Sequence, residues 1–139
     1  MRLLLSLGII FLAHSAFAQP HERNHPIDVR TDTCIDANPS THGTLECLDD
    51  AHTEWDAELN RVYQVLLGDL NDETQELLRA AQRAWIAFRD AELEALASVY
   101  GGLDGTMWLV VHADRRVSLI RRRAKELRDY LWSLNPDEG

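Results

Sequence analysis

Apolar side chains near the end of the chain recur at alternating intervals of three and four residues. The series comprises Val110, Ala113, Val117, Ile120, Ala124, Leu127, Leu131 and Leu134. This spacing places the side chains along one face of a helix, which becomes stable when it is buried against other helices. The pattern favours an all-α fold, and no strand-like alternation of useful length competes with it.

Two earlier segments have stripes of the same kind. The first is expected to begin near Thr44 and end near Leu70, with apolar residues at Leu48, Ala51, Trp55, Leu59, Val62, Leu66 and Leu70. The second follows a turn at 71–73 and ends near Val99; its core-facing residues are predicted to be Leu78, Ala81, Trp85 and Phe88, flanked by Leu77 and Ala84. With a last helix that begins between Asp104 and Thr106, the sequence predicts an antiparallel three-helix bundle.

The first 18 residues have the features of a signal peptide. Arg2 precedes an apolar run over 3–13, and Ala16-Phe17-Ala18 has the form of a cleavage site. We therefore expect cleavage after Ala18 and a periplasmic or secreted protein, without a stable membrane anchor because the run is too short to span a bilayer. Residues 19–33 are expected to form a flexible arm, 34–134 the helical domain and 135–139 a frayed tail.

An exported chain with two cysteines is expected to form a disulfide, here between Cys34 and Cys47. This bond would pin a loop at residues 34–43, in which Asn38-Pro39-Ser40 is typical of a turn. A metal site is disfavoured because no His or Cys pair has zinc-ligand spacing. No catalytic motif or phosphate-binding loop is present either, so the sequence predicts a protein that is not an enzyme, with no catalytic residues and no cofactor.

The charge of the chain is negative and unevenly distributed. The formal net charge is −9, and the segment from Gln19 to Val110 contains 18 acidic and 6 basic residues. The segment from Val111 onward is slightly basic, with 7 basic and 5 acidic residues. This balance argues against nucleic acid or an anionic membrane as partner; it favours either a basic protein partner or simple solubility.

Three stretches, Asp56–Tyr63, Leu78–Glu92 and Arg123–Leu127, resemble the LprI-like lysozyme-inhibitor family of small exported bacterial proteins. The family pattern is D-x-x-L-N-x-x-Y, then L-R-x-A-Q-R-x-W-I-x-(F/Y)-R-D-A-E-C, then R-a-x-E-L. The resemblance implies a helical fold and inhibition of lysozyme. The chain departs from the pattern at Leu93, where the family commonly has a cysteine that pairs with one in the last helix; here both cysteines are missing.

The family motif is interpreted as a polar network that fixes helix register. Long polar side chains at a helix seam are costly unless they are paired, so Gln82 and Arg89 are expected to meet partners on a neighbouring helix. Asp56 is the candidate partner of Arg89. The full set of predicted motif residues is Asp56, Asn60, Tyr63, Gln82, Trp85, Arg89 and Asp90.

These observations support two functional hypotheses. In the first, the chain inhibits a basic lysozyme by occluding its cleft, through the disulfide-pinned loop or the glycine-rich loop at 100–105. The candidate contact residues are Asn38, Ser40, His42, Tyr100 and Asp104. In the second, the chain is a non-inhibitory periplasmic adaptor, or an immunity protein against a secreted effector.

Overall fold

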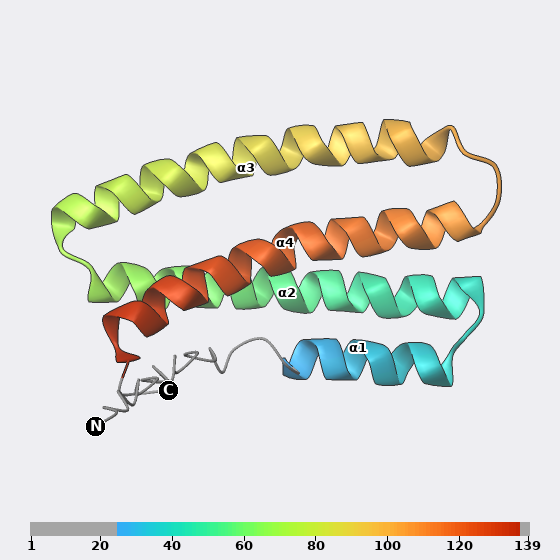
Figure 1. Cartoon of the computed structure of the whole chain (residues 1–139), viewed down its shortest axis with the longest axis horizontal. Coiled ribbons are helices and arrows are strands. Elements are labelled where there is room, and N and C mark those ends of the chain that lie inside the picture. The colour runs from blue at the N-terminus through green and yellow to red at the C-terminus, as the bar shows by residue number, and fades with distance from the viewer. Residues whose placement is uncertain (1–24, 137–139) are drawn as a thin grey trace, which may run out of the picture.

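The computed structural model describes residues 25–136, which form four helices and contain no strand. The helices are α1 (Pro26–Ala37), α2 (Thr41–Asp69), α3 (Asp72–Gly101) and α4 (Met107–Leu134). Successive helices run in opposite directions, and α4 lies between α3 and α2 (Figure 1). The all-α prediction is confirmed, but the predicted three-helix bundle is wrong because a fourth helix precedes the other three.

Helix α1 occupies much of the segment that was expected to be a flexible arm. Pro26 stands at its first turn, where the missing N–H costs nothing, and His25 Nδ1 accepts a hydrogen bond from the Ile27 N–H at 3.3 Å. The expected arm is therefore helical from Pro26 onward. The predicted signal peptide, its cleavage site and the rest of the arm up to residue 24 lie outside the described residues, as do residues 137–139.

The core lies between α2 and α4. Both predicted stripes supply it, and Trp55, Val62, Leu66 and Leu127 are almost completely buried. Helix α2 begins at Thr41 instead of Thr44, because Ser40 Oγ accepts a hydrogen bond from the Gly43 N–H at 3.0 Å and caps the helix earlier. The two long helices therefore form the rigid centre to which α1 and α3 are attached.

The disulfide between Cys34 and Cys47 is confirmed, and it joins α1 to α2. Its surroundings differ from the expected loop, since residues 34–37 belong to α1 and residues 41–43 to α2. Only Asn38-Pro39-Ser40 connects the two helices. The bond therefore fastens a short helix beside a long one, and the turn between them is held from both sides.

Helix α3 packs against α4 and makes almost no contact with α2. Asn71 Oδ1 caps it by accepting from the Thr74 N–H at 2.9 Å. Only Leu78 and Gln82 are buried along its length, and Trp85 is half-buried. The predicted core-facing stripe is thus partly wrong: Leu77, Ala81, Ala84 and Phe88 are exposed, because a single neighbouring helix covers only one side of α3.

Candidate partner-binding site

The two connections that the sequence proposed for recognition lie at the same end of the molecule. The α1–α2 turn at 38–40 and the α3–α4 connection at 102–106 share this end because α1 and α3 run in the same direction (Figure 1). We call it the disulfide end. Asn38 and Ser40 lie in the turn and Asp104 in the connection, whereas His42 belongs to the first turn of α2 and Tyr100 to the last turn of α3.

A groove of about 610 Å³ opens beside the disulfide, between the start of α2 and α4. Its lining includes Asn38, Gly43, Leu48, Ala113 and the disulfide itself. Three carboxylates line it as well, those of Glu46, Asp49 and Asp50, and we call these three residues the acidic patch. All three are exposed.

The acidic patch belongs to a stretch of α2 with strongly biased charge. Residues 41–60 contain six acidic residues and no Lys or Arg. Farther along this stretch two of the three carboxylates are in ion pairs, Glu54 with Arg30 and Glu58 with Arg61, and Asp56 accepts a hydrogen bond from Asn60. Asp49 and Asp50 form no ion pair with any residue between 25 and 136, and Glu46 lies 3.3 Å from Nε2 of His42. The negative charges of Asp49 and Asp50 are therefore available to a partner.

Two further groups set the electrostatics of the groove. Arg116 of α4 lines its wall, and His52 of α2 lies nearby. Burial lowers the pKa of His52 below its ordinary value of 6.5, and the positive charge of Arg116 lowers it further. His52 is therefore held neutral near pH 7. The groove then has three carboxylates and one guanidinium, so its net charge is negative.

The α3–α4 connection adds an apolar surface at this end. Leu103, Met107 and Leu109 are exposed, and Tyr100 stacks with Trp108 at a ring-centroid distance of 6.0 Å. Gly105 has a φ of 105°, a left-handed backbone conformation that favours glycine. We call Leu103, Met107 and Leu109 the apolar tip. The sequence predicted Tyr100 and Asp104 as contact residues but not these neighbours, although their position beside three glycines, at a break between helices, is a signal of exposure.

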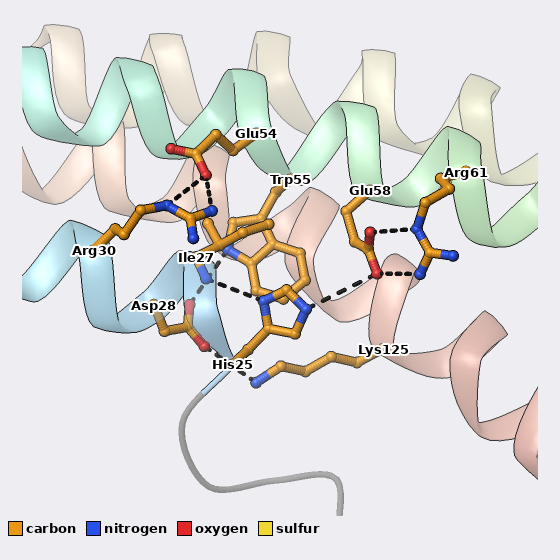
Figure 2. A network of polar contacts seen from close by, with 9 residues as sticks. All are labelled: His25, Ile27, Asp28, Arg30, Glu54, Trp55, Glu58, Arg61 and Lys125. Atoms are coloured by element: carbon orange, nitrogen blue, oxygen red, sulfur yellow. Dashed lines mark hydrogen bonds and ion pairs between the residues drawn. The ribbon is translucent and has the colours of Figure 1, made fainter. Parts of the chain in front are cut away.

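A polar network holds α1 in place and so fixes the disulfide end (Figure 2). Asp28 accepts hydrogen bonds from Trp55 Nε1 at 3.3 Å, Arg121 Nη1 at 3.2 Å and Lys125 Nζ at 3.4 Å. The His25 ring lies on the Trp55 ring with centroids 4.4 Å apart. Burial, followed by the positive charge of Arg128, lowers the pKa of His25 below 6.5, although Glu58 opposes this shift. Helix α1 is therefore anchored at its start by this network and near its end by the disulfide.

The family motif joins α3 to α4. Arg123 of α4 donates from Nε to Oε1 of Gln82 at 3.0 Å, and its Nη1 pairs with Glu126 at 2.7 Å. The guanidinium groups of Arg123 and Arg89 lie 5.9 Å and 5.5 Å from the centroid of Trp85. The expectation that Gln82 meets a partner on a neighbouring helix is confirmed, and that partner is Arg123.

The other expected contacts of the motif are not formed. Arg89 pairs with its neighbour Asp90 at 2.7 Å, and Asp56 bonds to Asn60 within α2. Asn60 is exposed, and Tyr63 is half-buried against the α2–α4 core. The predicted Asp56–Arg89 pair is wrong because α4 occupies the position between α2 and α3. Leu93, at the position of the missing cysteine, is half-buried on α3.

Between residues 25 and 136, no group of three or more His, Cys, Asp or Glu side chains is arranged to hold a metal ion. Within the same range, no helix has the length and apolar character needed to cross a membrane.

Comparisons with known proteins connect this architecture to relatives. A family model described as lysozyme inhibitor LprI matches residues 34–127. An uncharacterized protein of Rhizobium meliloti (strain 1021) is 29% identical over 100 residues, which cover 63% of this chain and 70% of the relative. A crystal structure of an uncharacterized protein from Burkholderia thailandensis superposes with a TM-score of 0.72 at 32% identity. That match covers 76% of this chain and 53% of the solved chain, so this chain spans about half the length of that relative.

Proposed function

The chain belongs to the LprI lysozyme inhibitor family, and on that premise we propose that it binds a basic lysozyme through its disulfide end and blocks the cleft of the enzyme. Family membership supports a protein partner and a non-catalytic role. The single observation that supports this binding site is that the acidic patch and the apolar tip lie at the same end of the molecule, where the disulfide joins α1 to α2.

In this proposal the acidic patch and the apolar tip contact different parts of the enzyme. Lysozymes cleave their substrate with two carboxyl groups that flank the scissile bond inside a cleft. The inhibitor's own carboxylates would be repelled there, so the acidic patch binds the basic surface around the cleft. The apolar tip, which has no charge of its own, enters the cleft and excludes substrate.

The rigidity of the disulfide end favours tight binding. A loop that is already held in one conformation loses little entropy when it docks. The start of α2, which carries the acidic patch, is fastened to the end of α1 by the Cys34–Cys47 bond, and Asp28 holds the other end of α1 against α4. The negative charge also steers a basic enzyme toward this end, which raises the association rate at low ionic strength.

A turbidity assay with purified chain tests the proposal. Lysozymes of several structural classes are incubated with the chain, and the clearing of a bacterial cell-wall suspension is followed over time. Inhibition at near-stoichiometric protein, weakened as salt screens the charges, supports the proposal. The absence of inhibition for every class contradicts it and points to the alternative role of adaptor or immunity protein.

We also propose that the chain acts outside the cytoplasm, after removal of residues 1–18. The signal-peptide features of the sequence support this location, as does the paired state of Cys34 and Cys47, which an oxidising compartment maintains. Expression of the full chain followed by N-terminal sequencing of the periplasmic protein tests it. A mature N-terminus at Gln19 is expected, and an intact chain retained in the cytoplasm would contradict the proposal.

A further inference from the structure

The side of α3 that α4 leaves uncovered carries a continuous apolar stripe. Its residues are separated by four, three, four, three, four and four positions, and all are exposed: Leu77, Ala81, Ala84, Phe88, Ala91, Ala95 and Val99. The three large members have exposed fractions of 66% for Leu77, 54% for Phe88 and 61% for Val99. The stripe lies roughly a third of a turn around the helix from the side that contacts α4.

We propose that this stripe is an interface for a second copy of the chain, whose α3 packs against it in the antiparallel direction. The spacing of three and four residues is the one that lets two helices pack side by side with interlocking side chains. This inference goes beyond the proposed function and does not depend on lysozyme binding.

The sizes of the side chains fit an antiparallel pair. When Ala84 faces Phe88 of the second copy, Ala81 faces Ala91 and Leu77 faces Ala95. Leu77 and Phe88 then each meet an alanine, which leaves room for them and lets the two helices approach closely, and Val99 reaches the level of Glu73 at the start of α3. A parallel pair would instead set Phe88 against Phe88 and alanines against alanines, which leaves voids between the large layers.

The flanking charges favour the same direction. Arg83 is exposed beside the seam and forms no ion pair with any residue of the described segment, and the carboxylates of Asp90 and Glu94 lie on the same flank. The antiparallel arrangement brings Arg83 beside Asp90 of the second copy, and this happens twice by symmetry. In a parallel pair the same flank of the two copies would lie on opposite sides of the seam, so Arg83 would not face the carboxylates of the second copy.

An apolar groove receives the end of the second helix. The same register brings Val99 of the second copy to the start of α3. There, a groove of about 390 Å³ lies between α2, α3 and α4, and its apolar lining includes Leu66, Leu70, Leu77, Ala81 and Leu134. The exposed valine and the open groove thus complement each other in the same arrangement that aligns the seam.

Sedimentation velocity of the purified chain with its disulfide intact tests the proposal. Wild-type protein is expected to form a dimer. Phe88→Asp should raise the dimer dissociation constant by at least about 100-fold, because the central layer is lost from both copies. Since Phe88 is more than half exposed, the variant should keep its helix content. Ile86→Asp, on the opposite side of α3 with an exposed fraction of 38%, is the matched control and should remain dimeric.

Two variants, each with one cysteine added to the intact Cys34–Cys47 pair, test the direction of packing. Residue 87 lies beside the two-fold axis of the antiparallel pair. In the Ala87→Cys variant, residue 87 should therefore form a disulfide with residue 87 of the second copy under mild oxidation. Ala80→Cys lies on the same flank, but it would be about 18 Å along the axis from its counterpart and should not cross-link. A monomeric wild type, a dimer that Phe88→Asp does not weaken, or equal cross-linking of both cysteine variants would overturn the proposal.

Discussion

Arg123 of α4 donates a hydrogen bond from Nε to Oε1 of Gln82 on α3, at 3.0 Å, in the only part of α3 that is fully buried. The guanidinium of Arg123 also lies over Trp85, 5.9 Å from the ring centroid. A buried charged group of this kind needs its acceptors, since each unmet donor costs free energy. This pair therefore attaches α3 to the α2–α4 core.

Replacing Gln82 with alanine should loosen α3. The substitution leaves Arg123 buried without one of its acceptors, and the free energy of unfolding should fall by about 1–3 kcal/mol. Chemical denaturation measures the total loss, and amide hydrogen exchange should show its largest increase along α3. An unchanged free energy of unfolding would show that the hydrogen bond does not hold this helix.

A double-mutant cycle distinguishes the observed network from the one expected from sequence. Because Arg89 bonds to Asp90 and Asp56 to Asn60, the effects of Arg89→Ala and Asp56→Ala on unfolding should add to within about 0.3–0.5 kcal/mol. The Gln82–Arg123 pair serves as the positive control and should show a larger coupling energy. Substantial coupling between Asp56 and Arg89 would support the network expected from sequence.

The disulfide should contribute strongly to the stability of α1. Cys34 and Cys47 are 13 positions apart, and closing a loop of this length is worth about 3 kcal/mol in the chain-entropy model. The double variant Cys34→Ser/Cys47→Ser should lose a free energy of that order and should exchange the amide protons of α1 faster than those of α4. Equal protection of the α1 amide protons from exchange in wild type and in the double variant would mean that Asp28 and Trp55 hold the helix without the disulfide.

Stability should decrease in mildly acidic solution, partly because of His25. Its folded pKa lies below 6.5, so as the pH falls through that value the unfolded chain binds a proton that the folded chain does not. The free energy of unfolding should therefore fall between about pH 7.5 and pH 5.5. His25→Asn keeps a side chain that can cap α1 and should show a smaller fall, which thermal melts across this range would measure. The same pH slope in both proteins would rule out a contribution from His25.

The long helices could be predicted because the spacing of their apolar residues by three and four positions indicates a helix with one buried face. Trp55, Leu66 and Leu127 lie in a core enclosed from both sides. The α2 stripe is buried up to Leu66, whereas the α4 stripe is buried in its middle and less so towards its two ends. The ends of α2 and α3 followed from local signals, and Asn71 caps α3 at the expected turn.

Helix α1 could not be predicted because most of what stabilises it is distant in sequence. Of its apolar residues only Ile27 is buried, and Asp28 is held by Arg121, 93 positions later. A local pattern carries no sign of such partners. Only Pro26 and Asp28 in the first turn are local signs of a helix start, and proline is equally common in extended chain.

The candidate site was predictable only in outline. The sequence identified the turn containing Ser40 and the connection containing Asp104, and the antiparallel order of the helices already implies their shared end. The groove beside the disulfide could not be predicted, because it depends on how α2 and α4 pack. The apolar stripe of α3 led to the opposite error: its periodicity predicted burial, yet Phe88 is exposed because α4 covers only the adjacent side. Periodicity shows that a face can be buried, and the tertiary arrangement decides whether it is.

The central claim is that the disulfide end blocks lysozyme, and inhibition by two charge-matched variants tests it most directly. Asp49→Asn/Asp50→Asn removes two carboxylates of the acidic patch, and Asp72→Asn/Glu73→Gln removes two from the first turn of α3 at the opposite end. Both variants have the same net charge. In the turbidity assay the acidic-patch variant should inhibit at least about tenfold more weakly, which corresponds to about 1.4 kcal/mol, while the control should inhibit like wild type. Equal inhibition by both variants, or a loss confined to the control, would contradict the account.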